Sequence, residues 1–296
     1  MRFWLVIMAA AALAGVAHGG VAQGAVAPPI ATPPVWQTLP PTPRLPAPAR
    51  QGRVAVDGAT IWYGQYGFQN RGTPVLLLHG GLANSDYFGL LVPALVRSGY
   101  RVIVMDSRGH GRSSPSTRPY SYALMARDVV GLLDHLGLRQ VDLVGWSDGG
   151  IVGLELGLNA PSRVRRLYAF GTNASLDGLR PDYDKKPVFA RYIERSAIES
   201  RAQGRSAAQH ATFLGEISRM WASEPAFTPD QLARIAIPVT MALGQHDEAI
   251  ARDHVVKIDS ALPNSVIEVV PNVSHLAMIQ QPAQFNASVI AFLRWR

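Results

Sequence analysis

The chain of 296 residues has no cysteine, only three lysines and no apolar run as long as a membrane span. Without cysteine there are no disulfides, so core packing must stabilise the fold. The net charge is +7, but the basic residues are scattered arginines rather than the dense runs typical of nucleic-acid binding. We therefore expect a soluble protein with no nucleic-acid partner.

The first apolar run is typical of a signal peptide. Arg2 supplies the positive start, residues 3–16 are apolar, and small residues follow. A membrane-spanning helix needs about 20 apolar residues, more than this run contains. We predict a signal peptide over residues 1–22, removed to leave a periplasmic or secreted protein with no stable membrane span. The alternative is an uncleaved anchor.

Residues 23–51 are rich in proline, which favours extended backbone. We interpret them as a tether between the signal peptide and the folded domain. The alternative is a segment that packs on the domain surface, with Trp36 and Leu39 as apolar anchors.

Beyond residue 52, apolar runs alternate with helix-like segments. A hairpin is predicted over residues 53–66, with its turn at Asp57-Gly58. Further strands are predicted at residues 75–78, 102–105, 141–144, 164–170, 239–243 and 266–270, and helices near 87–98, 121–136, 149–159, 251–261 and 282–294. This order predicts an α/β fold, with a mostly parallel eight-stranded sheet covered by helices on both faces. Residues 52–171 and 230–296 form this core.

The alternation stops over residues 172–229, where no strand is evident and helices are predicted near 188–202 and 207–223, with another near 229–235. We interpret residues 172–229 as a helical lid over the carboxyl edge of the sheet, where ligands of open α/β sheets bind. The alternative is a peripheral insertion without a role at the site.

Residues 145–150, with the sequence Gly-Trp-Ser-Asp-Gly-Gly, lie between a predicted strand and a predicted helix. This context is the one that a nucleophile elbow needs. Glycines at 145 and 149 let the strand and helix approach each other, so that Ser147 is held at the carboxyl edge of the sheet. The sequence therefore predicts Ser147 as a nucleophile.

A serine nucleophile needs a histidine base and a carboxylate that orients it, and here both are expected later in the chain. Asp247 follows the predicted strand 239–243, and His275 follows the last predicted strand by a short loop. Glu248 and Asp177 are the competing acids. An alternative role for Asp247 alone is a helix N-cap.

The tetrahedral intermediate needs hydrogen-bond donors, which we expect to be the backbone N–H groups of Asp148 and Gly81. Trp146, Leu82 and Asp148 are the predicted substrate contacts. The Asp148 carboxylate is expected either to face a cationic substrate group, such as the amine of an amino-acid ester, or to cap its helix.

A second glycine-rich loop over residues 105–114 lacks the G-x-x-x-x-G-K-[ST] pattern of a phosphate cradle. We interpret it as scaffold, braced by pairing between Asp106 and Arg108. No metal or organic cofactor is implied.

Together these motifs resemble the α/β-hydrolase superfamily. The resemblance rests on His79-Gly80-Gly81, the loop 106–113, the elbow 145–150, Gly244-x-x-Asp247 and His275, and it covers residues 52–296. The elbow also resembles the biphenyl-hydrolase-like esterases and related small lactonases.

The resemblance and the residues together predict a serine hydrolase acting on a small-molecule carboxylic ester or lactone. The same triad serves C–C bond hydrolysis, peptidase action at a small N-terminal residue and cofactor-free perhydrolysis, which stay as alternatives. An alternative of another class is a ligand sensor that keeps a hydrolase fold.

Overall fold

The computed structural model describes residues 32–294. The predicted signal peptide and residues 23–31 of the predicted tether lie outside this range. Within the described part of the chain, no helix is long and apolar enough to cross a membrane.

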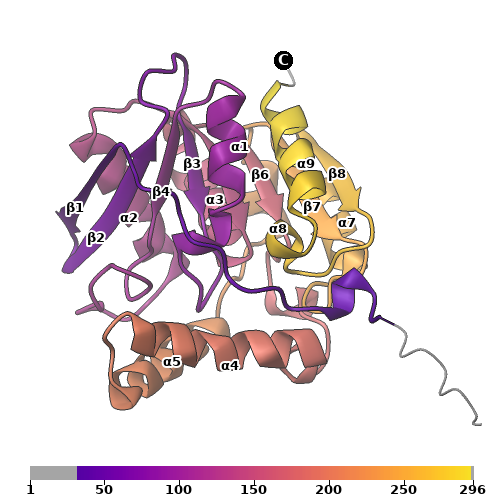
Figure 1. The fold of residues 1–296 in the computed structure, drawn as a ribbon. Helices are drawn as coiled ribbons and strands as arrows, with labels where there is room; N and C mark the ends of the chain where they lie inside the picture. Colours follow the sequence, from indigo (N-terminus) through magenta and orange to yellow (C-terminus); the bar gives the residue numbers. More distant parts are fainter. Residues whose placement is uncertain (1–31, 295–296) are drawn as a thin grey trace, which may run out of the picture. The chain divides into compact units, whose positions relative to one another are not determined.

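Eight strands form one sheet in the order β1-β2-β4-β3-β5-β6-β7-β8 (Figure 1). The hairpin β1–β2 and the pair β2–β4 are antiparallel, and all other neighbours are parallel. The strands are β1 (Arg50–Val56), β2 (Ala59–Tyr66), β3 (Val75–Leu78), β4 (Val102–Met105), β5 (Val141–Trp146), β6 (Val164–Phe170), β7 (Val239–Gly244) and β8 (Ser265–Val270). The predicted mostly parallel eight-stranded sheet is confirmed.

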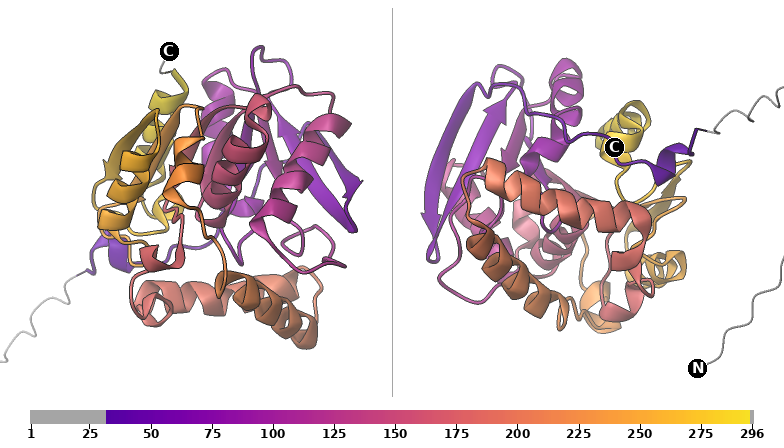
Figure 2. Two further views of the ribbon diagram at one scale, coloured as in Figure 1. Left: turned by 180° about the vertical axis from the view of Figure 1, so that it is seen from behind. Right: turned by 60° about the horizontal axis from the view of Figure 1, so that its bottom comes forward.

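Helices cover both faces of this sheet. In Figure 1, α1 and α9 lie in front of the strands, whereas the view from behind in Figure 2 shows α2, α3 and α7 on the opposite face. The helices are α1 (Leu91–Arg97), α2 (Tyr122–His135), α3 (Asp148–Asn159), α4 (Pro187–Ala202), α5 (Ala207–Trp221), α6 (Pro229–Ala233), α7 (Arg252–Ala261), α8 (Ala277–Gln280) and α9 (Pro282–Arg294). Strands β3, β4 and β5 are buried along their whole length, which is why they are continuously apolar.

The prediction and the structure differ at two elements. The predicted helix 87–98 is a 3₁₀ turn at Ser85–Phe88 followed by the short helix α1, because the chain turns at Gly89. The one-turn helix α8 was not predicted, since four residues give no periodic pattern.

Helices α4 and α5 lie across the carboxyl ends of the parallel strands (Figures 1 and 2). Each of the two helices forms a side-chain hydrogen bond with the core. The Tyr192 hydroxyl donates to the Gly81 carbonyl, and the Trp221 indole donates to Asp148. The segment 172–229 therefore covers the loops that follow β3 and β5.

The described part of the predicted tether is not separate from the domain. Residues 33–49 run along its surface, with a 3₁₀ turn at Val35–Gln37, and β1 begins at Arg50, within the predicted tether. Trp36 stacks on His246 with ring centroids 4.0 Å apart, and Arg195 of α4 donates to the carbonyls of Leu39 and Pro40. These residues therefore pack on the surface of the domain, which is the alternative that the sequence left open.

Candidate active site

Ser147 stands at a sharp turn between β5 and α3. Its backbone has φ 53° and ψ −119°, a strained conformation for a residue with a side chain. A Cβ on Gly145 would lie 2.4 Å from the carbonyl oxygen of Gly149, and one on Gly149 would lie 2.1 Å from that of Leu78. Only glycines allow this approach of helix and strand, so the local sequence holds Ser147 at the carboxyl edge.

His275 and Asp247 meet at the same edge, beyond β8 and β7. The His275 Nδ1 lies 3.0 Å from one carboxylate oxygen of Asp247 and 3.2 Å from the other. The second of these oxygens also accepts hydrogen bonds from the backbone N–H groups of Ala249 and Ile250, which fix the carboxylate. Nδ1 is thus the protonated nitrogen when the ring is neutral, and Nε2 is left as a base.

The competing carboxylates occupy other positions. Asp177 is 65% exposed in its side chain and pairs with Ser175, 3.7 Å from His254. Glu248 accepts from the backbone N–H of His275 at 3.1 Å rather than from its ring. Asp247 is therefore the carboxylate that contacts the His275 ring.

The electrostatic surroundings of His275 favour its charged form. Burial by itself lowers the pKa of the imidazole, but the negative charge and hydrogen bond of Asp247, with the charges of Glu248 and Asp148, outweigh it. The pKa of His275 therefore lies above its ordinary value. A ring of this kind takes up a proton readily, as a general base must.

The expected backbone donors lie at the start of α3 and in the loop after β3. The N–H of Asp148 belongs to the first turn of α3, where N–H groups have no partner within the helix and the helix dipole is positive. The Gly81 loop is fixed by the Tyr192 hydroxyl on its carbonyl and by His79. His79 Nε2 accepts from the Ser107 N–H at 3.0 Å, and its Nδ1 bonds the Gly80 carbonyl at 2.8 Å.

Ser147, Asp148 and His275 line one small cavity under α4 and α5. Its volume is about 40 Å³, and its other walls are Tyr122, Asn173, Leu179, Tyr183, Phe189, Trp221, Glu224, Pro225, Ala249 and Ile250. Pockets that bind drug-sized ligands are roughly 300–1,000 Å³. The space beside Ser147, which is itself partly exposed, is therefore much smaller than a typical ligand pocket in this structure.

The Asp148 carboxylate does not cap α3. Instead it accepts hydrogen bonds of 3.0 Å from the Tyr122 hydroxyl and from the Trp221 indole N–H. Burial raises its pKa to about 6, although these two bonds and the charge of His275 lower it. At neutral pH the cavity therefore has an anionic wall beside Ser147.

Two predicted substrate contacts are not among the residues that line this cavity. Trp146 is 1% exposed, and its ring centroid lies 5.3 Å from that of Tyr87, 5.9 Å from that of Tyr192 and 6.0 Å from that of His275. Leu82 lines a different cavity, with His110 and Ser200. The roles of Trp146 and Leu82 as substrate contacts therefore stay predictions.

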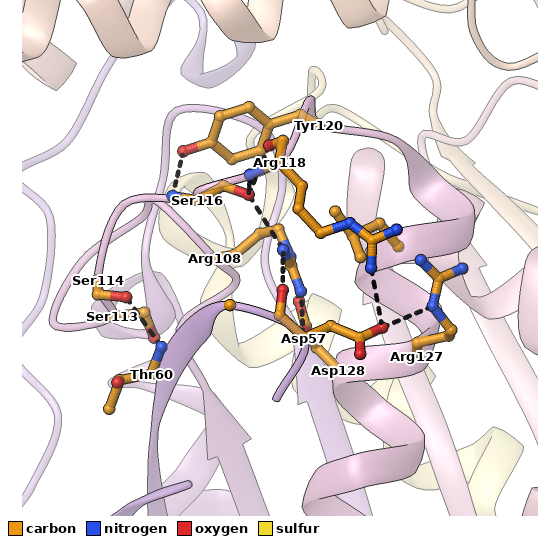
Figure 3. Close-up of polar contacts among 12 residues, drawn as sticks. Asp57, Thr60, Arg108, Ser113, Ser114, Ser116, Arg118, Tyr120, Arg127 and Asp128 are labelled. Carbon is orange, nitrogen blue, oxygen red and sulfur yellow. Dashed lines mark hydrogen bonds and ion pairs between the residues drawn. The ribbon is translucent and has the colours of Figure 1, made fainter. Parts of the chain in front are cut away.

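The predicted pairing of Asp106 with Arg108 is wrong. The fully buried Arg108 guanidinium donates to Asp128 of α2 at 2.5 and 2.7 Å, and to the Ser116 hydroxyl (Figure 3). A buried guanidinium requires a buried carboxylate, and Asp128 is the one that α2 supplies. Asp106 instead accepts from Arg112 and Ser85, so the loop is braced by different partners.

The cavity residues that the sequence analysis did not single out include Tyr122, Trp221 and Glu224. Glu224 accepts from the backbone N–H of Tyr122 at 2.9 Å, and Tyr122 and Trp221 both bond Asp148. They come from the start of α2, the last residue of α5 and the segment after it, far from the motifs in the chain. No local pattern marks them, because only the folded chain brings them to the elbow.

Comparisons with known proteins agree with this architecture. Residues 73–220 match the family model described as the alpha/beta hydrolase fold. The chain belongs to this family and is a hydrolase.

Relatives and solved structures cover most of the chain. The serine hydrolase BPHL of Homo sapiens is 27% identical over 262 residues, covering 82% of this chain and 86% of that protein. The 3-oxoadipate enol-lactonase 2 of Acinetobacter baylyi is 27% identical over 251 residues, covering 78% and 92%. A solved hydrolase from Pseudomonas aeruginosa PA01 superposes with a TM-score of 0.63 at 26% identity, covering 83% and 99%.

Proposed function

We propose that the chain is a serine hydrolase that cleaves a carboxylic ester or lactone. The observation that carries the proposal is that Ser147 and the ring of His275, itself bonded to Asp247, border one small cavity. The names of the relatives, a serine hydrolase and an enol-lactonase, support the same chemistry.

In this mechanism the Ser147 hydroxyl attacks the carbonyl carbon while Nε2 of His275 takes its proton. Asp247 holds Nδ1–H and stabilises the imidazolium. The backbone N–H groups of Gly81 and Asp148 donate to the oxyanion. His275 then protonates the leaving alcohol, and water hydrolyses the acyl-enzyme in a second, similar step.

The charges of the cavity narrow the substrate class. Its acidic side chains are Asp148 and Glu224, and among the described residues that line it there is no lysine or arginine. A carboxylate-bearing substrate would meet repulsion without a compensating cation. We therefore propose that the substrates are neutral or cationic esters and lactones. The same repulsion weighs against C–C hydrolysis of dienoate anions.

Active-site labelling tests the nucleophile. A fluorophosphonate should label the wild-type protein and a Ser260→Ala control, whose serine is exposed on α7, but not Ser147→Ala. His275→Ala should slow labelling by a factor of about 10³ or more. Labelling of Ser147→Ala at the wild-type rate would contradict the proposal.

Turnover separates an enzyme from a ligand sensor. A panel of short, long, aromatic, lactone and amino-acid esters should include at least one substrate that is turned over many times, with activity lost in Ser147→Ala. A single acylation event without release would instead indicate a binding protein.

Export belongs to the same proposal. N-terminal sequencing of the protein recovered from the periplasm or the medium should begin near residue 23. Recovery of the uncleaved chain in the membrane fraction would indicate an anchor.

A further inference from the structure

The small cavity at Ser147 has a roof, and the structure indicates what holds this roof in place. Helix α4 forms this roof. Phe189 lines the cavity with its ring 5.7 Å from that of His275, and the Tyr192 hydroxyl donates to the Gly81 carbonyl beneath. Any movement of α4 therefore changes the space above Ser147.

The neighbouring face of α4 grips the N-terminal segment 33–45, which we call the strap. Arg191 donates to the Gln37 carbonyl at 2.9 Å, and Arg195 donates to the carbonyls of Leu39 and Pro40 at 2.8 and 2.5 Å. One turn further, the Thr42 hydroxyl donates to Glu199 at 2.5 Å. These three helix residues are spaced by four, so they form one row along α4.

The composition of the strap favours these hydrogen bonds to α4. Its prolines cannot donate backbone hydrogen bonds, and they hold the chain extended before it binds. Extended backbone outside a sheet leaves its carbonyl oxygens available, and guanidinium groups donate to them strongly. Ordering such a preorganised segment costs little conformational entropy.

The same stretch of the strap also contacts the loops that carry His275 and Asp247, through residues that alternate with those bound by α4. The Gln280 amide nitrogen donates to the Thr38 carbonyl at 2.9 Å, while its carbonyl oxygen accepts from the N–H of Ser274 at 2.8 Å. Trp36 stacks on His246, beside Asp247. The strap thus joins the roof to the two loops that support the predicted base.

We propose that the strap is a brake on the roof of the active site, and that Arg191 and Arg195 are positioning residues that act through α4. While the grip holds, α4 stays over Ser147 and the cavity admits only small acyl groups. When it is lost, the roof opens more often and bulky esters enter. The effect on turnover rests on the proposed function, but the effect on roof movement does not.

Hydrogen–deuterium exchange of the full chain tests the movement directly. In Arg191→Ala/Arg195→Ala, amides of residues 187–202 should exchange at least about tenfold faster, because charge-assisted hydrogen bonds to three carbonyls are lost. Arg201→Ala, an exposed arginine at the last turn of the same helix, is the matched control. Amides of α3 report on global stability and should not change. Equal exchange of α4 in the double variant and the control would overturn the proposal.

Two further measurements test the contact at Trp36 and the effect of the strap on substrate size. Trp36→Ala should accelerate exchange of α4 although the Trp36 ring stacks on His246 rather than on α4, and unchanged exchange there would overturn the claim that the strap joins the two sites. The ratio of kcat/KM for a bulky ester to that for an acetate ester should rise in Arg195→Ala and return toward wild type in Arg195→Lys. A ratio that stays fixed while α4 exchanges faster would refute the brake on substrate size and leave the serine mechanism untouched.

Discussion

The indole N–H of Trp221, the last residue of α5, donates a 3.0 Å hydrogen bond to the carboxylate of Asp148, the residue after Ser147. A side chain of α5 is thereby bonded to the residue that follows Ser147. The Tyr122 hydroxyl bonds the other carboxylate oxygen. Asp148 is therefore fixed in position before any substrate binds, with its charge facing the same cavity as Ser147.

A fixed carboxylate beside the reacting carbon should favour cationic acyl groups. We expect Asp148→Asn to lower the ratio of kcat/KM for a betaine ester to that for the isosteric 3,3-dimethylbutyrate ester by about tenfold or more, because only the first carries a charge. Steady-state kinetics with both esters of one alcohol measures this. Tyr122→Phe, which removes one hydrogen bond but keeps the charge, is the control. Equal losses on the two esters would show that Asp148 does not read substrate charge.

The same preference should depend on pH. Burial raises the pKa of Asp148 to about 6, so the carboxyl group is anionic above pH 6 and becomes neutral below it. The betaine ester stays cationic throughout. The preference for it should therefore decline as the pH falls through about 6 in the wild type and stay flat in Asp148→Asn. A ratio independent of pH in both proteins would contradict this.

The acidic limb of the pH profile should report His275. Its pKa lies above the ordinary value because Asp247, Glu248 and Asp148 together outweigh the effect of burial. A protonated ring cannot act as a base, so kcat/KM should fall as the pH drops through this raised pKa.

Glu248→Gln tests the electrostatic cause. Glutamine keeps an acceptor for the His275 N–H but removes a negative charge, so the acidic limb should move to lower pH. Glu268→Gln, a charge-neutralising change on β8, is the control. A limb that does not move in Glu248→Gln would mean that Glu248 does not set the protonation of His275.

Much of this architecture could be predicted from the sequence, for identifiable reasons. Strands buried on both faces are continuously apolar, so β3, β4 and β5 were found with little error. Ser147 directly follows β5, and Asp247 and His275 lie in the short loops after β7 and β8. Parallel strands bring such positions to one edge whatever the lengths of the helices between them.

The features that could not be predicted from the sequence depend on contacts between segments that are far apart in the chain. Asp106 and Arg108 are neighbours in the chain, yet Arg108 pairs with Asp128, because only the folded loop directs the guanidinium toward α2. Trp221 of α5 likewise bonds Asp148, 73 positions earlier in the chain. The strap was open to two interpretations, since proline-rich sequence fits both a free tether and a docked segment.

The tight approach of α3 to β5 gives a prediction about glycine. A Cβ on Gly145 would lie 2.4 Å from the Gly149 carbonyl, so Gly145→Ala should force the helix away and destabilise the protein by about 1–3 kcal/mol or more. Gly215 of α5 has open space around it, and Gly215→Ala should be neutral or stabilising by up to about 1 kcal/mol. Urea denaturation measures both. Equal stability of the two variants would contradict the crowded elbow.

The buried pair of Arg108 and Asp128 should dominate the stability of the loop after β4. Both side chains are almost fully buried, and the guanidinium makes two hydrogen bonds to the carboxylate. Removing one partner leaves the other charge buried and unpaired, which costs about 3–5 kcal/mol, so Asp128→Ala should lower the free energy of unfolding by that amount.

Two comparisons make this prediction specific. In Arg108→Met/Asp128→Ala no charge is left uncompensated, so the double variant should be more stable than the sum of the single losses implies. Arg127→Ala breaks the exposed pair with Asp57, drawn beside the buried one in Figure 3, and should leave the unfolding midpoint unchanged, since solvent screens that pair. Additive losses in the double variant would mean that the two charges do not depend on each other. A loss in Arg127→Ala as large as that in Asp128→Ala would mean that burial does not set the cost.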